Sequence, residues 1–185
     1  RIIAGEAKGR RLFAPPGADT RPTADRVRES VFNILGTALR GQCVLDLFGG
    51  TGAMALEALS RGASRATIVD CSEQAMKVIR RNAQSVLGAE GIDRVELLRL
   101  DYRSAIPGLK IASYMYIFLD PPYRMIDAYD DALRLLEEHK KLAGGWTAIL
   151  ERDARQTISL SGCYECFDER KYGKAVIEFV RRKTD

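Results

Sequence analysis

Short apolar segments alternate with amphipathic helical segments along most of this chain, from residue 42 onward. Four of the apolar segments end in an aspartate or in a run of glycines. Strands that alternate with helices of about 10–15 residues are typical of βαβ units, which build a parallel sheet covered on both faces. We therefore predict an α/β fold, with strands at 43–48, 66–69, 95–100, 114–119 and 146–150, helices at 52–61, 72–87 and 126–139, and a closing antiparallel pair at 163–167 and 175–180.

The first 40 residues differ from the rest in charge. They contain eight basic and four acidic residues, whereas the remaining residues contain 21 of each. The positive surplus therefore lies at one end, which indicates contact with a polyanion, although a basic surface that is merely solvated is the alternative. We expect an extended segment at 1–13, a loop at 14–23 and a helix at 24–39. We accordingly divide the chain into a basic N-terminal extension, 1–40, and a second domain, 41–185.

A glycine-rich loop follows the first strand of the second domain and opens a helix. Its residues are Asp46-Leu47-Phe48-Gly49-Gly50-Thr51-Gly52, a spacing that does not meet the dinucleotide fingerprint Gly-x-Gly-x-x-Gly. Glycines at such a position let a ligand approach the backbone closely. The order Asp-x-Phe-x-Gly-x-Gly instead matches the first motif of enzymes that use S-adenosylmethionine, in which Asp46 could bind the cofactor's ammonium group. A simple tight turn is the alternative.

Aspartates end three other predicted strands. Asp70 follows 66–69, Asp101 follows 95–100 and Asp120 follows 114–119. Ligands of open α/β sheets bind outside the carboxyl ends of the strands, so we expect these aspartates and the glycine loop to converge on one crevice. There Asp70 is placed to bind a ribose diol, or else to cap the helix at 72–87, and Asp101 to accept a hydrogen bond from an adenine amino group.

The most specific motif is Asp120-Pro121-Pro122-Tyr123, directly after a strand. Two consecutive prolines cannot extend a central strand, so they fix a rigid turn that directs Asp120 and the Pro121 carbonyl into the crevice. The exocyclic amine of a nucleobase is a poor nucleophile, because its lone pair is delocalised into the ring. Two acceptors on its two N–H groups draw it toward tetrahedral geometry, and Tyr123 offers a flat face on which the base stacks. An ordinary turn with a buried tyrosine is the alternative.

Further motifs support a family resemblance. They are Arg1-Ile2-Ile3-Ala4-Gly5, Lys8-Gly9-Arg10-Arg11-Leu12, Thr20-Arg21-Pro22-Thr23, Asp25-Arg26-Val27-Arg28-Glu29, Leu45-Asp46-Leu47-Phe48 and Glu57-Ala58-Leu59-Ser60-Arg61-Gly62-Ala63. With Asp120–Tyr123, this ordered set resembles the RsmD family of bacterial 16S ribosomal RNA guanine-N2 methyltransferases, from the first residue to Lys171-Tyr172-Gly173. Gly49 and Thr51 depart from the family, in which alanine and serine are commoner, and so does Lys174-Ala175.

The resemblance implies a Rossmann-like class I methyltransferase sheet, mostly parallel with a C-terminal antiparallel strand, after a small basic N-terminal extension. It implies methyl transfer from S-adenosylmethionine, with S-adenosylhomocysteine as product, to the exocyclic N2 amine of a guanine in 16S ribosomal RNA or a small-subunit assembly intermediate. The implied cofactor-binding residues are Asp46, Phe48, Gly49, Gly50, Gly52, Asp70, Cys71, Asp101 and Tyr102. The implied catalytic residues are Asp120, Pro121, Pro122 and Tyr123, and the implied RNA-binding residues are Lys8, Arg10, Arg11, Arg21, Arg26 and Arg28. The loop Thr20–Thr23 is implied to close over the cofactor.

Other functions stay open. A DNA adenine or cytosine amino-methyltransferase would share the turn at Asp120, but such enzymes usually carry a target-recognition region for which 185 residues leave little room. A protein glutamine methyltransferase usually has asparagine where Asp120 stands. A non-catalytic RNA-binding module with a vestigial cofactor fold would retain the basic end. A nicotinamide oxidoreductase fits least, because the glycine spacing is wrong.

The cysteines and the hydropathy give weaker signals. Cys163 and Cys166 have the spacing of half a zinc site, but His139 is the only histidine and a zinc site needs about four ligands, so we predict no metal. No stretch approaches the roughly 20 apolar residues of a membrane span, and no secretion signal is visible. We expect a cytoplasmic protein without a membrane partner.

Overall fold

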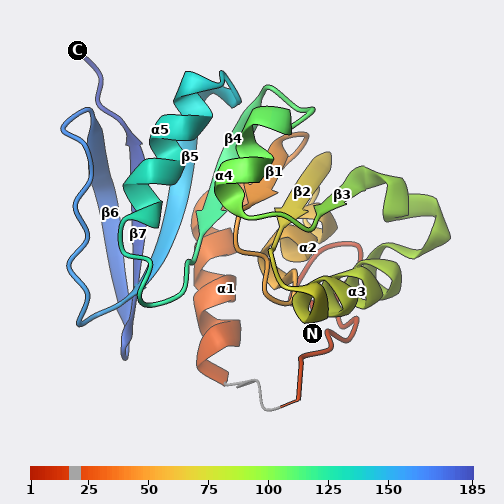
Figure 1. Cartoon of the computed structure of the whole chain (residues 1–185). Coiled ribbons are helices and arrows are strands. Elements are labelled where there is room, and N and C mark those ends of the chain that lie inside the picture. The colour runs from red at the N-terminus through yellow and green to blue at the C-terminus, as the bar shows by residue number, and fades with distance from the viewer. Residues whose placement is uncertain (17–21) are drawn as a thin grey trace.

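The computed structural model describes residues 1–16 and 22–185, and in this part of the chain seven strands form a sheet in the order β3-β2-β1-β4-β5-β7-β6 (Figure 1). The strands β1 to β5 pair in parallel, β7 pairs antiparallel with β5, and β6 pairs antiparallel with β7. The predicted fold class is thereby confirmed. The strands are β1 (Cys43–Asp46), β2 (Arg65–Val69), β3 (Val95–Leu98), β4 (Tyr114–Leu119), β5 (Leu142–Asp153), β6 (Tyr164–Tyr172) and β7 (Ala175–Arg182).

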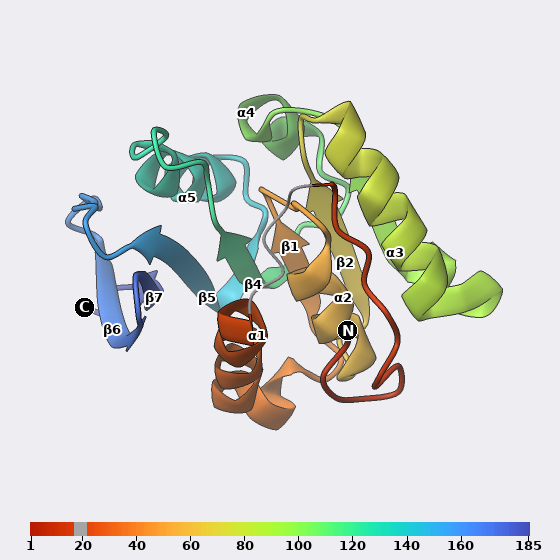
Figure 2. The same ribbon diagram turned by 90° about the horizontal axis from the view of Figure 1, so that it is seen from below.

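Helices cover both faces of the sheet (Figure 2). Because successive side chains of a strand point to opposite faces, Phe118 of β4 packs in a core with α1, α2 and α3, while Leu119 packs in a second core with α4 and α5. The helices are α1 (Pro22–Leu35), α2 (Ala53–Ser60), α3 (Glu73–Gly91), α4 (Tyr102–Ala105) and α5 (Ala128–Glu138), with short 3₁₀ segments η1 (Gly36–Leu39), η2 (Ile92–Arg94) and η3 (Ile106–Gly108). In the described part of the chain, none of these helices is long and apolar enough to cross a membrane.

The elements differ from the predicted ranges mainly toward the C-terminus. β5 begins at Leu142, before the predicted 146–150, and β6 continues to Tyr172, beyond the predicted 163–167. β5 begins earlier because Leu142 pairs with Tyr114 of β4. β6 is longer because its antiparallel ladder with β7 continues to the pair Tyr172↔Ala175 and includes polar residues that an apolar pattern misses. α4 was not predicted, because it has only four residues, and Asp101 caps it by accepting a 2.8 Å hydrogen bond from the Arg103 N–H.

The N-terminal segment packs into the same core as the sheet. Ile2, Val31 and Phe32 are buried together with residues of α2 and β4. The predicted extended segment at 1–13 is instead bent back on itself, since the Ile2 N–H donates to the Arg10 carbonyl at 2.8 Å and the Gly9 N–H donates to the Ile2 carbonyl at 2.9 Å. The division that we predicted at residue 40 therefore does not separate two hydrophobic cores.

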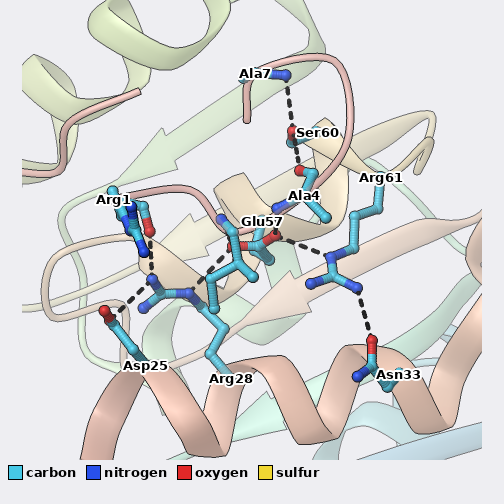
Figure 3. Close-up of polar contacts among 10 residues, drawn as sticks. Arg1, Ala4, Ala7, Asp25, Arg28, Asn33, Glu57, Ser60 and Arg61 are labelled. Atoms are coloured by element: carbon cyan, nitrogen blue, oxygen red, sulfur yellow. Dashed lines mark hydrogen bonds and ion pairs between the residues drawn. The ribbon is translucent and has the colours of Figure 1, made fainter. Parts of the chain in front are cut away.

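One buried carboxylate fastens this segment to α2 (Figure 3). Glu57 is 0% exposed. Its Oε1 accepts hydrogen bonds from the Ile3 N–H at 2.9 Å and the Arg28 Nε at 3.2 Å. Its Oε2 accepts hydrogen bonds from the Ala4 N–H at 3.1 Å and the Arg61 Nε at 2.9 Å. All four donors are thus satisfied by a single side chain, which ties α1 and the first residues to α2.

The chain passes so close to α2 at Gly5 that no side chain fits there. Gly5 has a φ of +89°, and a Cβ atom would lie 2.0 Å from the Ser60 carbonyl oxygen. The Ser60 hydroxyl closes the contact, since its Oγ donates to the Ala4 carbonyl at 2.7 Å and accepts from the Ala7 N–H at 2.9 Å (Figure 3). The glycine of the first motif is therefore explained by packing rather than by ligand binding.

Candidate active site

A cavity of about 690 Å³ opens where the strand order of the sheet reverses. β1 and β4 are neighbours, but the chain continues from β1 toward β2 and from β4 toward β5, so the loops after these two strands diverge. The structure brings the predicted strand-end residues together around this cavity. Its lining is Leu47, Phe48, Gly50, Asp70, Cys71, Leu100, Asp101, Tyr102, Arg103, Asp120, Pro121, Pro122 and Met125.

The glycine loop is held tightly against β2. The Gly49 N–H donates to the Val69 carbonyl at 2.9 Å, and a Cβ on Gly49 would lie 2.4 Å from the Ile68 Cγ2. Gly52 has a φ of +82° and leads directly into α2. Gly49 is thus required by packing and Gly52 by backbone conformation. The cofactor contacts predicted for both stay predictions, and Gly50 lines the cavity.

Asp70 joins the ends of β1 and β2. Its Oδ2 accepts a hydrogen bond from the Gly50 N–H at 3.0 Å, and its Oδ1 accepts one from the Ser72 N–H at 2.9 Å. Helix α3 is capped by Ser72 instead, whose side chain accepts from the Ala75 N–H at 3.1 Å. Each Asp70 oxygen retains acceptor capacity, so the two oxygens can still receive both hydroxyls of a ribose.

The far wall of the cavity combines aromatic rings with a second carboxylate. The rings of Phe48 and Tyr102 pack against each other with their centroids 5.4 Å apart. Tyr102 is buried, and its hydroxyl donates to Asp131 at 2.7 Å. Burial and that hydrogen bond raise the pKa of Tyr102. Asp101 is exposed beside it, so an apolar surface and a hydrogen-bond acceptor lie together, as a purine ring requires.

Asp46 faces a smaller cavity of about 210 Å³, which also contacts α1, β4, β5 and β7. The carboxylate is only 3% exposed and accepts one hydrogen bond, from the Phe48 N–H at 3.1 Å. Burial raises the pKa of Asp46 to about 7; the Phe48 hydrogen bond opposes this, and the negative charges of Asp70 and Glu151 add to it. A cation in this cavity would stabilise the ionised form.

Asp120 lies between the two cavities and lines both. The residue as a whole is exposed, whereas its carboxyl group is desolvated by the surrounding protein. Desolvation raises the pKa of Asp120 well above its ordinary value. The negative charge of Glu151, a hydrogen bond with Glu151 and the negative charge of Asp46 raise this pKa further. A carboxylate whose pKa is raised is a better proton acceptor than a solvated one.

The proline turn after Asp120 has the predicted form. Pro121 is buried and lines the larger cavity, as does the exposed Pro122. The turn closes when the Met125 N–H donates to the Pro122 carbonyl at 2.8 Å. Tyr123 is 58% exposed, so the buried tyrosine that we considered as an alternative is wrong. Tyr123 itself lines neither cavity, although Pro121 and Pro122 before it line the larger one.

Three residues near the site were not predicted. Glu151 lines the smaller cavity with Asp120, and Gln156 and Arg155 lie beside Tyr123. A sequence signal for Glu151 exists, because it follows the apolar run 146–150 just as Asp120 follows 114–119. Arg155 and Gln156 lie beyond the strand and carry no comparable signal.

The predicted RNA-binding residues divide into two groups. Lys8, Arg10, Arg11 and Arg26 are exposed. Arg28 is instead 6% exposed, and its guanidinium is occupied by Glu57, by Asp25 at 3.2 Å and by the Arg1 carbonyl at 2.5 Å (Figure 3). The predicted phosphate contact of Arg28 therefore disagrees with the structure, which uses this side chain to hold the fold. Arg21 and Thr20, the first half of the loop Thr20–Thr23, lie outside the described residues.

The cysteines do not form a cluster. Cys43, Cys71, Cys163 and Cys166 are free thiols, and no group of three potential metal ligands occurs among the described residues. Burial, followed by the charge of Glu178, raises the pKa of the Cys166 thiol to about 11. A thiol with such a pKa is a poor nucleophile at neutral pH.

Comparison with known proteins places the chain in a family. A family model described as Conserved hypothetical protein 95 matches residues 1–181. Ribosomal RNA small subunit methyltransferase D of Escherichia coli (strain K12) is 33% identical over 150 residues, which cover 80% of this chain and 69% of the relative. The chain belongs to the RsmD family. YlbH of Bacillus subtilis (strain 168), provisionally named an rRNA methyltransferase, is 35% identical over 155 residues, which cover 83% of this chain and 82% of YlbH.

Solved structures share the fold of this RsmD-family chain. Escherichia coli yhhF, provisionally named a methyltransferase, has a TM-score of 0.82 at 27% identity, and the match covers 100% of this chain and 98% of yhhF. SMU.776, provisionally named a methyltransferase and solved in complex with SAH, has a TM-score of 0.64 at 18% identity, covers 84% and 48% of the two chains, and shows the fold alone. The chain is an S-adenosylmethionine-dependent methyltransferase, and the predicted cofactor is confirmed at the level of the family.

Proposed function

We propose that this RsmD-family chain transfers a methyl group from S-adenosylmethionine to the exocyclic N2 amine of a guanine in 16S ribosomal RNA. The observation that carries the proposal is the position of Asp120 and Pro121, where a rigid turn borders a nucleoside-sized cavity. The names of the relatives, which refer to the small ribosomal subunit, support RNA as substrate.

The cavities fit the cofactor in size and in chemistry. Asp70 is placed to bind the ribose hydroxyls, Asp101 the adenine amine, and the pair Phe48–Tyr102 the flat purine face. Asp46 would then stabilise the ammonium group from the smaller cavity. When bound, S-adenosylmethionine supplies an electrophilic methyl group on a positively charged sulfur. The cluster of carboxylates around both cavities favours such a positive ligand.

Asp120 and Pro121 prepare the amine for attack. The carboxylate of Asp120 and the Pro121 carbonyl each accept a hydrogen bond from one N–H of the amine. These two hydrogen bonds return lone-pair density to the nitrogen. As the nitrogen bonds to the methyl carbon, the bond from that carbon to the donor sulfur would break, leaving its electron pair on the S-adenosylhomocysteine that departs. The nitrogen also loses one proton, for which the carboxylate of Asp120 is the proposed acceptor. The pKa of Asp120 is raised above its ordinary value, which makes its carboxylate a stronger base for this proton. Most of the acceleration comes from positioning and charge complementarity.

The RNA must bring an unstacked base to this turn, because the amine of a paired guanine is unreachable within a helix. Lys8, Arg10, Arg11 and Arg26 are exposed and are proposed to bind its phosphates. Arg21 remains in the proposal from the sequence alone, and Arg28 is left out because it is buried. Binding through phosphates weakens steeply as the salt concentration rises.

Tritium transfer from labelled S-adenosylmethionine tests the substrate class. Purified chain is incubated with 16S ribosomal RNA, with small subunits and with duplex DNA, all isolated from cells that lack this enzyme. We expect label in an RNA sample and none above background in DNA. Label in DNA alone would support a DNA amino-methyltransferase. Donor binding without transfer to any sample would support a non-catalytic RNA-binding module.

A further inference from the structure

A short loop after β5 is fastened to the proline turn. Gln156 is buried, and its Nε2 donates to the Tyr123 carbonyl at 2.6 Å. The Oε1 of Gln156 accepts from the Asp153 N–H at 2.9 Å, and its carbonyl accepts from Arg152 at 3.0 Å. The loop and the turn are therefore held in one arrangement, although they are 33 residues apart in sequence.

This loop places a cation over an exposed aromatic ring. The Arg155 guanidinium lies 5.6 Å from the centre of the Tyr123 ring. Asp153 fixes its orientation, since its two carboxylate oxygens accept from the Nε at 2.9 Å and from an Nη at 3.1 Å. The hydrogen bonds from Arg155 lower the pKa of Asp153 to about 2, so the pair stays ionised at neutral pH. A planar guanidinium is thus presented to a ring that is 58% exposed.

The Arg155 guanidinium lies closer to the Tyr123 ring than the two walls of a base-binding slot would stand, so Arg155 must move outward to admit a base. Stacked bases are separated by about 3.4 Å, so two flat groups that enclose a base stand about 7 Å apart. The observed 5.6 Å is about 1.4 Å less, and Arg155 is exposed on a long side chain that can move outward. Aromatic rings and arginine planes are the two surfaces on which proteins stack unpaired RNA bases.

We propose that Arg155 and Tyr123 form the two walls of a binding slot for the unstacked purine, with Arg155 as the outer wall. This inference rests on the proposed function and goes beyond it, because it proposes that Arg155, a residue outside the Asp120–Tyr123 motif, also binds the base. The inner wall belongs to the same turn as Asp120, which brings a base in the slot near that carboxylate. Gln156 acts as a positioning residue, because it holds the turn and not the base.

The chain contains a matched control for Arg155. Arg170 binds Asp168 through the same two atoms at the same distances, 2.9 and 3.1 Å, and both arginines are exposed. Within the described residues, no aromatic ring lies beneath the guanidinium of Arg170. Arg155→Ala and Arg170→Ala therefore remove the same charge and the same kind of ion pair, and only the first removes a wall of the slot.

Steady-state methyl transfer to RNA is the first test. Loss of one stacking partner is expected to lower kcat/KM for RNA by about 10- to 100-fold in Arg155→Ala, with the donor Kd unchanged and Arg170→Ala within about twofold of wild type. Arg155→Lys keeps the positive charge but lacks the planar guanidinium, so it should recover only part of the kcat/KM that Arg155→Ala loses. Equal effects of Arg155→Ala and Arg170→Ala, or full activity of Arg155→Lys, would overturn the proposal.

A second test does not depend on RNA methylation. Guanosine 5′-monophosphate is titrated into the donor-loaded protein and followed by NMR, with ribose 5-phosphate as the matched probe without a base. We expect Arg155→Ala to weaken the binding of guanosine monophosphate and to leave the binding of ribose 5-phosphate unchanged. If the variant binds both probes more weakly by the same factor, Arg155 binds phosphate and the slot does not exist. A wild-type protein that binds the nucleotide through Arg155 but modifies no RNA would contradict the proposed function and leave the slot standing.

Discussion

The buried carboxylate of Glu57 allows a quantitative prediction for the variant Glu57→Gln. Each oxygen accepts one backbone N–H and one arginine, so an amide in either orientation turns an NH₂ group toward two donors. The variant loses one neutral hydrogen bond of about 1 kcal/mol and one charged bond of about 1.5–3 kcal/mol. The sum agrees with the roughly 3–5 kcal/mol expected when one partner of a buried ion pair is neutralised.

Urea unfolding followed by circular dichroism measures this cost. With an m value of about 2 kcal/mol/M, a loss of about 2.5–4 kcal/mol should lower the midpoint by about 1.2–2 M. Amide exchange should accelerate at Ile3 or at Ala4, whichever N–H group faces the new NH₂ group, because that N–H loses its acceptor. Glu165→Gln is the control. Glu165 forms a 2.9 Å ion pair with Arg181, and the two side chains are 35% and 51% exposed, respectively. Such an exposed pair contributes about 0.2–1 kcal/mol to stability. Equal shifts in the two variants would refute the assignment of Glu57 as the residue that fixes the N-terminal segment.

Three further predictions concern the site itself. Because the pKa of Asp46 is raised to about 7, its proton must leave before a ligand's ammonium binds, so donor affinity should fall about tenfold per pH unit below 7 and stay level above it. Calorimetry from pH 5.5 to 8 measures this, and a constant wild-type affinity, or the same pH dependence in Asp46→Asn, would contradict the role of Asp46. Asp120→Ala should lower transfer by at least about 100-fold while donor affinity stays within a few-fold, and normal turnover would exclude the assigned role. The double variant Arg10→Glu, Arg11→Glu should weaken RNA binding, with a salt slope smaller by about 2, and spare donor binding; unchanged RNA affinity would remove these residues from the interface.

The sequence predicted which residues surround the larger cavity better than it predicted how the first 40 residues pack. Strand ends in a parallel sheet meet at one edge, so Asp70, Asp101 and Asp120 could be placed together from spacing alone. Arg28 could not, because the sequence does not reveal that α1 turns this side chain inward onto Glu57, 29 residues away. Charge counts treat buried and exposed arginines alike.

The C-terminal part was harder for a different reason. The residues that complete the site there, Glu151, Arg155 and Gln156, depend on how β5 ends and on the long β6–β7 ladder that covers its edge. Tertiary contacts set these positions, whereas the proline turn at Asp120 is determined locally by the covalent geometry of proline.

The identity of the methylated atom tests the central claim most directly. Ribosomal RNA modified by the wild-type protein is digested to nucleosides and analysed by mass spectrometry beside RNA treated with Asp120→Ala. We predict N2-methylguanosine with the wild type and none with the variant. A methyl group on a ring nitrogen or a ribose, or one that persists without the Asp120 carboxylate, would contradict the account.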